Sequence, residues 1–136
     1  MARVEPRKAD HRDVDALVEL RAKMFHAMGA SHDDTSWRGH ARNWFVALID
    51  DPAYGIFVLE ETGRVVACAM GAIRDAAPSP NVPAGRDVLV SNLCTSPERR
   101  GRGYGRAVFE AVLRWAHQSG AGRAELMATD AGARNV

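Results

Sequence analysis

The feature that most constrains the fold is the segment 91–115, SNLCTSPERRGRGYGRAVFEAVLRW. An apolar, strand-like run ends near Thr95, a proline turn follows, and glycines at alternate positions precede a run with the spacing of an amphipathic helix. Such a turn exposes backbone N–H groups at the helix start, and a nest of this kind binds phosphate. Gly101, Gly103 and Gly105 allow the backbone to close around a ligand because they carry no side chain. The segment therefore predicts either a loop that wraps a phosphorylated ligand in backbone amides or a basic turn that happens to be rich in glycine.

The spacing of these glycines differs from two common phosphate-binding motifs. It reads G-x-G-x-G and not the dinucleotide-binding G-x-G-x-x-G, and no Lys-Ser or Lys-Thr pair follows the last glycine as in a P-loop. Glu125 lies about where a ribose-binding acid would fall, but it begins a predicted strand and does not end one. Neither motif therefore explains the loop.

The rest of the chain alternates helical and strand-like runs. We expect a short strand within residues 2–8, helices over 10–29, from about 35 and over 106–119, and strands over 54–60, 65–73, 87–95 and 124–129. Proline-rich residues 74–86 should form a surface loop. The second helix has an apolar stripe that we expect in the core, formed by Trp37, Ala41, Trp44, Phe45 and Leu48.

Composition limits the class of protein. A chain of 136 residues fits one domain, and a net charge of +1 with 26% charged residues gives no general field for nucleic acid or membranes. Cys68 and Cys94 lie in apolar runs typical of buried thiols, which favours a reducing compartment. No apolar signal region or membrane-spanning stretch is seen, so we expect a cytoplasmic protein.

The glycine segment resembles a motif of a known family. TSPERRGRGYGRAVFEAVLRWA looks like motif A of the GCN5-related N-acetyltransferases (GNAT), in which Arg or Gln is followed by two residues, Gly, one residue, then Gly or Ala; Arg100, Gly103 and Gly105 match it. Leu93 and Thr95 fall where that family has its alternating apolar pair, and VEPRKADHRDVDALVELRA resembles its first strand and helix. The resemblance implies a GNAT-type acyl-CoA N-acyltransferase fold of the α/β (α+β) class. Its central sheet would be mixed and mostly antiparallel, with helices on both faces.

The resemblance also implies a function, the transfer of an acetyl group from the cosubstrate acetyl-CoA to an amine, which we expect to be a small molecule, in a ternary complex. The strand before the loop would carry a bulge, and its backbone around Leu93 and Thr95 would pair with the pantetheine arm. The pyrophosphate would lie against the loop residues Arg100, Gly101, Arg102, Gly103, Tyr104, Gly105 and Arg106. Arg99, Arg102 and Arg106 could add charge, although each could equally be a solvated surface residue.

Of the two proton transfers in this reaction, removal of a proton from the amine costs more, so a general base matters more than a general acid. An alkylamine of pKa ~10.4 costs about 4.6 kcal/mol to deprotonate at neutral pH, whereas a thiol of pKa ~8.5 leaves as thiolate at a cost of about 2 kcal/mol. The usual carboxylate base is not evident in DVLVSNLCT, and Glu125, at a strand start, is more typical of an exposed residue. Ser91 or Asn92 could orient a water that carries the proton away, or either could satisfy local backbone groups. Regular alternation would place residues 87, 89, 91, 93 and 95 on one face of the strand and 88, 90, 92 and 94 on the other.

The connection between the first two helices is where the family binds its acceptor. There Asp33 and Asp34 could attract an ammonium group and His26 or His32 could relay a proton, although helix capping and ordinary exposed histidines explain the same residues. The histidines show no metal-ligand spacing, so no metal site is expected.

The predicted elements end earlier than the family pattern does. Family members continue with a further helix, which often carries a tyrosine that protonates the thiolate, and with two more strands. We therefore interpret residues 1–136 as a single GNAT-like domain without its C-terminal part, in which the edge strand 124–129 could pair with a second copy to form a homodimer.

Two rival functions stay open. One is an inactive GNAT-like domain that binds acyl-CoA. The other is a basic nucleic-acid-binding module in which Tyr104 of RRGRGYGR stacks on a base, which the single occurrence of the motif and the near-neutral charge disfavour.

Overall fold

The computed structural model describes residues 4–30 and 35–127. Its elements, in chain order, are β1 (Arg7–Lys8), α1 (Val14–Ala27), α2 (Ser36–Leu48), β2 (Tyr54–Glu61), β3 (Arg64–Asp75), β4 (Arg86–Thr95), α3 (Tyr104–Gln118) and β5 (Ala124–Leu126), with short 3-10 helices at His11–Asp13 and Pro97–Arg99. The predicted order of helices and strands is confirmed; β5 covers the first three residues of the predicted strand 124–129, and residues 128 and 129 lie outside the described residues.

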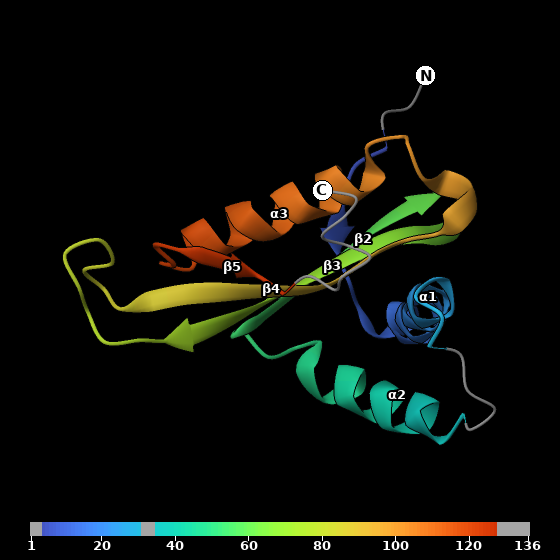
Figure 1. Ribbon diagram of the computed structural model, residues 1–136, viewed down its shortest axis with the longest axis horizontal. Coiled ribbons are helices and arrows are strands. Elements are labelled where there is room, and N and C mark those ends of the chain that lie inside the picture. Colours follow the sequence, from blue (N-terminus) through green and yellow to red (C-terminus); the bar gives the residue numbers. More distant parts are fainter. Residues whose placement is uncertain (1–3, 31–34, 128–136) are drawn as a thin grey trace.

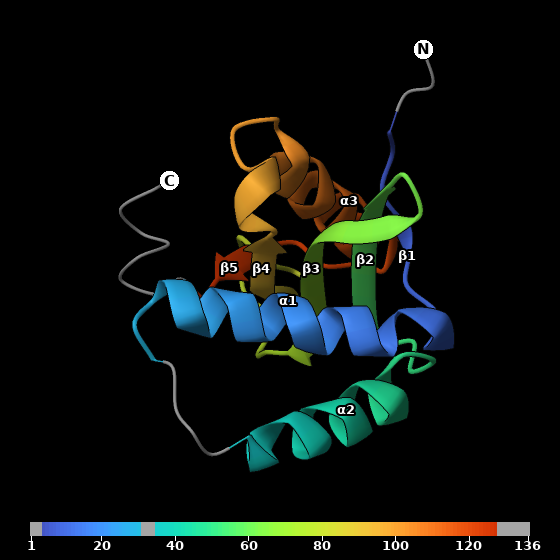
Figure 2. The ribbon, with the colours of Figure 1, turned by 90° about the vertical axis from the view of Figure 1, so that its right-hand side faces the viewer.

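The five strands form one sheet in the order β1-β2-β3-β4-β5. The pairs from β1 to β4 are antiparallel, whereas β4 and β5 are parallel. Helix α3 lies on one face of this sheet, and α1 and α2 lie on the other (Figures 1 and 2). The expected fold class, a mixed and mostly antiparallel sheet with helices on both faces, is confirmed.

The face beneath α3 is packed closely around one tryptophan. Valines of β4 and α3 form the centre of this core, and Trp115 lies over the strands beside them. A Cβ atom at Gly55 would lie 2.4 Å from Cδ2 of Trp115, and one at Gly71 would lie 2.7 Å from Cγ1 of Val112. Both glycines therefore allow α3 to approach the sheet more closely than a side chain would permit.

The opposite face is covered mainly by α1, which buries Val14, Leu17 and Val18 against the sheet. Helix α2 lies beyond α1 (Figure 2), so only a narrow strip of it reaches the core. Phe45 is the one residue of α2 that is fully buried. The expectation that the whole apolar stripe of α2 is core is wrong, since Trp44 is 45% exposed.

Two turns follow from local sequence signals. Thr62 and Gly63 both have positive φ, 50° and 79°, as a two-residue hairpin turn between β2 and β3 requires. Gly103 has φ 80° as the N-cap of α3, so this helix begins at Tyr104, two residues earlier than predicted.

No helix among residues 4–30 and 35–127 has the length and apolar character needed to cross a membrane.

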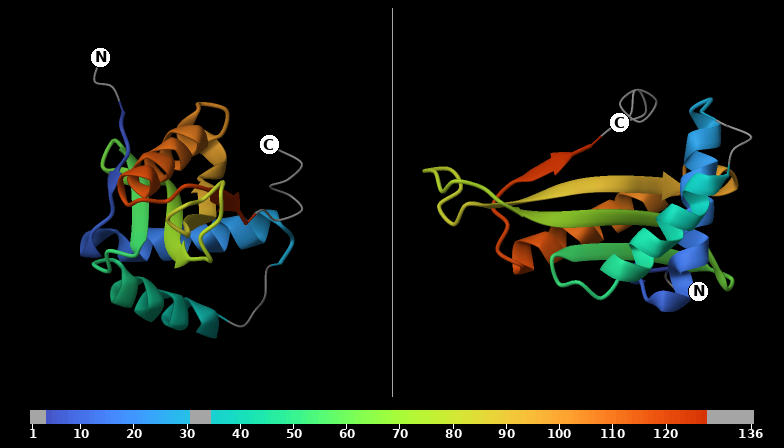
Figure 3. Two further views of the ribbon diagram at one scale, coloured as in Figure 1. Left: turned by 90° about the vertical axis from the view of Figure 1, so that its left-hand side faces the viewer. Right: turned by 90° about the horizontal axis from the view of Figure 1, so that it is seen from below.

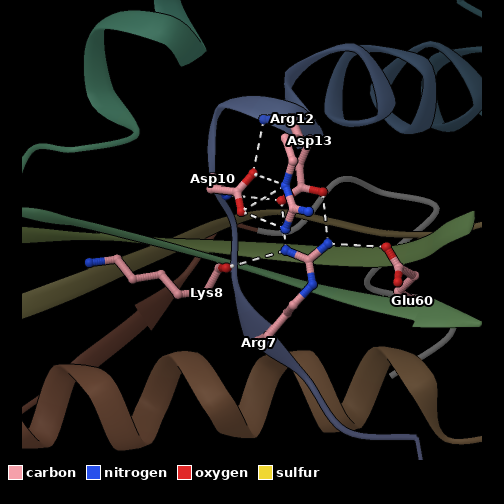
Figure 4. A network of polar contacts seen from close by, with 6 residues as sticks. All are labelled: Arg7, Lys8, Asp10, Arg12, Asp13 and Glu60. Carbon is pink, nitrogen blue, oxygen red and sulfur yellow. Dashed lines mark hydrogen bonds and ion pairs between the residues drawn. The ribbon is translucent and has the colours of Figure 1, made fainter. Parts of the chain in front are cut away.

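The start of α1 is fixed by an ion-pair network (Figure 4). Arg7 donates to both carboxylate oxygens of Asp13 at 2.8 and 2.9 Å, and to Glu60 of β2 at 3.2 Å. Asp10 and Asp13 form a capping box at the first helical turn, in which Asp10 is the N-cap. The network connects β1, the start of α1 and β2, and so sets how α1 crosses the sheet.

Candidate functional site

Strand β4 contains a bulge just before the glycine loop. Cys68 of β3 pairs with Cys94 and Met70 pairs with Ser91, so two residues of β4, Asn92 and Leu93, oppose one residue of β3. Asn92 has φ 55°, a left-handed conformation that asparagine tolerates better than most residues. The bulge that the family resemblance implied is confirmed.

The bulge reverses which side chains face which helix. Leu93 packs in the core under α3 together with Val88 and Val90, and the Thr95 hydroxyl lies 3.2 Å from the position of a Cβ atom at Gly105. Cys94 instead joins the core under α1. The expected alternation along this strand is therefore wrong. It assumed that odd-numbered residues share one face throughout 87–95, but the extra residue at the bulge exchanges the faces of odd- and even-numbered residues after it.

The bulge also changes which backbone N–H and C=O groups of β4 face away from β3. Before the bulge, the Val88 N–H donates to Arg123 O and Val90 O accepts from the Met127 N–H, so both face β5. After the bulge, the Ser96 N–H donates to Val66 O on β3, at 2.8 Å. Alternation then directs the N–H and C=O groups of residues 93 and 95 away from β3. Pairing with β5 ends at Val90 and β5 diverges from β4 (Figure 3), so these groups lie on an edge that no strand among the described residues occupies.

The glycine loop continues directly from this open edge. Gly101 and Gly103 both have φ 80°, and a Cβ atom at either would meet no atom within 4 Å. Their backbone conformation, and not crowding, is what requires glycine. Six consecutive amides donate to no acceptor among the described residues, those of Gly101, Arg102, Gly103, Tyr104, Gly105 and Arg106. Together with the positive end of the α3 dipole, they form a nest for an anion.

One carboxylate holds the loop in place. Glu61, at the end of β2, is 2.8 Å from Nε of Arg99 and 3.6 Å from Nη1 of Arg102, and it accepts a hydrogen bond from the Tyr104 hydroxyl. The Glu61 side chain is only 18% exposed. Sequence reasoning missed Glu61, because it lies about 40 residues before the loop and shows no local signal of this contact.

The loop arginines differ in what they bind. Arg99 and Arg102 are engaged by Glu61, and Arg106 pairs with Glu110 one turn along α3 at 3.0 Å. The backbone N–H of Arg100 donates to Pro97 O, but its side chain has no hydrogen bond or ion pair within the described ranges. These contacts favour the surface or anchoring interpretation for three of the four arginines and leave Arg100 available to a ligand.

Asn92 connects the bulge to α1. It is 8% exposed, and its Oδ1 accepts a hydrogen bond from Nη1 of Arg21 at 2.9 Å. The Arg21 guanidinium also lies over the Phe25 ring, 4.9 Å from its centroid. Arg21 was not singled out from the sequence, since a single arginine on a helix carries no motif. Ser91, the other predicted catalytic residue, is half-buried on the strand before the bulge.

The two cysteines lie side by side under α1 and both are buried, as expected. A hydrogen bond from Cys68 lowers the pKa of Cys94, and the positive charges of Arg21 and Arg100 lower it further against the effect of burial. The hydrogen bond to Cys94 and complete burial raise the pKa of Cys68. The bulge therefore lies in a locally positive environment.

The remaining predicted residues lie away from the bulge or outside the described residues. Glu125 is 64% exposed and pairs with Arg74 at 2.8 Å, which fits a surface role. His26 is exposed in the last turn of α1. His32, Asp33 and Asp34 lie outside the residues that the structure describes. Within those residues, no group of three His, Cys, Asp or Glu side chains could hold a metal ion.

Comparison with known proteins identifies the family. The sequence model described as the acetyltransferase (GNAT) family matches residues 14–136, so the chain belongs to the GNAT family. A comparison with curated proteins finds no match.

Three solved structures illustrate the similarity of fold. A predicted acetyltransferase from Clostridium acetobutylicum, determined with acetyl-CoA, is 22% identical with a TM-score of 0.82, over 96% of this chain and 84% of that one. A GCN5-related N-acetyltransferase from Ralstonia eutropha JMP134 is 25% identical with a TM-score of 0.79, over 98% and 88% of the two chains. Glucosamine-6-phosphate N-acetyltransferase from Arabidopsis thaliana is 16% identical with a TM-score of 0.72, over 96% and 85%.

Proposed function

We propose that this chain transfers an acetyl group from acetyl-CoA to an amine. The observation that carries the proposal is the continuity of the open edge of β4 with the six free amides of the glycine loop. A ligand with an extended, amide-containing arm followed by a pyrophosphate matches that surface. The arm can pair with the open edge of β4, and the pyrophosphate can bind the amides of the loop.

In this proposal the pantetheine arm pairs with the backbone of Leu93 and Thr95, and the pyrophosphate lies against the amides of residues 101–106. Arg100 adds a positive charge that no described carboxylate neutralises. The amide that faces the thioester carbonyl would stabilise the oxyanion that develops there. Binding then depends mostly on main-chain geometry, so side-chain identity at Leu93 and Thr95 matters little.

The reaction proposed is direct attack in a ternary complex. The neutral amine nitrogen forms a bond to the thioester carbonyl carbon, the C–S bond breaks, and coenzyme A leaves as thiolate. The amine loses one proton to water and the thiolate gains one. Asn92 already accepts a bond from Arg21. Ser91 makes no hydrogen bond through its hydroxyl among the described residues, and we therefore favour it as the group that orients the water.

Calorimetric titration with acetyl-CoA tests the proposal, with coenzyme A and ATP as controls. We expect micromolar binding of acetyl-CoA and coenzyme A, and much weaker binding of ATP, which lacks the pantetheine arm. Equal binding of ATP, or no binding by folded protein, would contradict the assignment of the β4 edge. Tight binding with no acetylation of any amine in a broad panel would favour the alternative, a non-catalytic acyl-CoA-binding domain.

A further inference from the structure

A cation contacts the bulge from the α1 side. Arg21 contacts Asn92, and Asn92 is the residue immediately before Leu93, whose backbone faces the open edge of β4. The guanidinium is half-buried and is held flat by Phe25. It is therefore fixed beside the place where the proposed function puts the thioester.

Only part of the hydrogen-bonding capacity of Arg21 is used. Nη1 donates to Asn92, whereas Nε and Nη2, which form the planar edge of the guanidinium, have no partner among the described residues. Elsewhere in the same protein that edge binds a carboxylate: Nε and Nη2 of Arg74 donate to Asp87 at 2.9 and 3.0 Å. Such a paired contact is the arrangement that arginine makes with carboxylates.

The charge near Arg21 is not balanced by a carboxylate of the residues that the structure describes. Arg21 forms no ion pair with a described carboxylate, and its charge together with that of Arg100 lowers the pKa of the neighbouring Cys94 thiol. By contrast, two arginines of α2 each pair with a carboxylate of α1: Arg38 with Glu19, and Arg42 with Asp15. A half-buried cation that has no anionic partner among the described residues is suited to an anionic group of a ligand.

We propose that Arg21 binds a carboxylate on the acceptor, and that the acceptor is therefore an aminocarboxylic acid. The inference rests on the proposed acetyl transfer and names its substrate class. Nε and Nη2 of Arg21 would hold the two carboxylate oxygens, while the Asn92 contact keeps the guanidinium in place. The amine of the same molecule would then reach the thioester beside residue 93.

This arrangement also helps the chemistry. A positive guanidinium near a bound ammonium group disfavours the protonated form and lowers the pKa of the amine. The same residue would therefore hold the acceptor and increase its neutral, nucleophilic fraction.

The test uses coenzyme A whose thiol carries a short mimic of the acceptor. Alkylation with N-bromoacetylglycine gives an adduct that ends in a carboxylate, and N-bromoacetylglycinamide gives a neutral partner of nearly the same shape. The β-alanine and γ-aminobutyrate homologues, each with its amide, cover the distance from the thioester to Arg21. Dissociation constants are measured by calorimetry for the full chain and for Arg21→Gln, Arg21→Lys and Arg42→Gln.

We expect at least one carboxylate adduct to bind about tenfold or more tightly than its amide, as a hydrogen-bonded charged group implies. The ratio should fall to near one in Arg21→Gln, recover in part in Arg21→Lys, and stay unchanged in Arg42→Gln, whose arginine pairs with Asp15 on the protein surface. A purely structural role of Arg21 would weaken both members of a pair equally.

Two results would overturn the proposal alone while coenzyme A still binds: no preference for any carboxylate adduct in the unaltered chain, or a preference that persists in Arg21→Gln. Failure of coenzyme A and of all adducts to bind folded protein would instead remove the proposed function, and this inference with it.

Discussion

Tyr104 in the first turn of α3 donates a hydrogen bond to Glu61 at the end of β2. The start of the helix that follows the glycine loop is thereby tied to a strand that is separated from β4 by β3. Glu61 also binds Arg99, which is 29% exposed, so one carboxylate holds the loop on both sides of Gly101 and Gly103.

Replacing Glu61 should weaken coenzyme binding even though it removes a negative charge near the proposed pyrophosphate site. In Glu61→Gln we expect acetyl-CoA to bind about tenfold more weakly, the size of one hydrogen bond to a charged group. Glu60→Gln is the matched control, because Glu60 is the neighbouring residue and pairs with Arg7 instead. Calorimetry measures both; tighter binding in Glu61→Gln would mean that charge outweighs loop geometry.

Gly103→Asp should abolish acetyl-CoA binding while the protein stays folded. Its carboxylate would stand beside the free amides and repel the pyrophosphate, and no neighbouring atom lies within 4 Å of the new Cβ. Gly29→Asp introduces the same residue at φ 76°, also without neighbours, and controls for backbone strain. Circular dichroism checks the fold of both variants. Unchanged affinity in folded Gly103→Asp would refute the loop assignment.

Gly55→Ala should destabilise the protein by about 1–3 kcal/mol, the usual cost of overpacking a core. The added methyl group would lie 2.4 Å from the Trp115 ring, so either the ring or α3 must move. Gly39→Ala, in α2 with open space around it, should be neutral or stabilise by up to about 1 kcal/mol. Denaturant unfolding of the two variants tests the difference; equal effects would contradict the packing described here.

Asp13 should contribute stability that depends on pH. Burial opposes its charge, but the hydrogen bonds from Arg7 and from the Asp10 amide prevail and lower the pKa of Asp13. A lowered pKa in the folded state means that the stabilisation is complete above the unfolded value of about 3.9 and is lost as the pH falls through the folded value.

Asp13→Asn should therefore lower the free energy of unfolding at neutral pH by about 1.5–3 kcal/mol. Its difference from the unaltered chain should shrink as the pH falls below about 4. Denaturant unfolding across a pH series measures this difference. Asp15→Asn, which breaks an exposed pair with Arg42, should change stability little at any pH. A constant difference between Asp13→Asn and the unaltered chain would argue against a role of the Asp13 charge.

Local signals were sufficient for most of the fold. Gly29 ends α1, Thr62 and Gly63 form the hairpin turn, and the glycine loop precedes a helix, because each depends on backbone conformations that a few neighbouring residues determine. The family resemblance supplied the sheet topology and the bulge, which periodicity alone did not reveal.

What the sequence did not reveal depends on contacts between distant segments. Glu61 reaches the loop from another strand, and Arg21 reaches the bulge from a helix about 70 residues earlier. Trp44 was expected in the core, but the position of α2 beyond α1 leaves it exposed. Such contacts are set by how the elements pack, and no spacing within one element predicts them.

The bulge in β4 decides which peptide groups of the site face outwards. Before the bulge, the N–H and C=O groups of the even-numbered residues 88 and 90 face β5. After the one extra residue, those of the odd-numbered residues 93 and 95 face the open edge. Deleting Asn92 would remove the bulge but leave Cys94 opposite Cys68, so the groups of residues 93 and 95 would still face the open edge. If Asn92 were kept and the strand ran on without a bulge, those groups would turn towards β3, so the binding edge depends on where the extra residue is accommodated as well as on which residues form it.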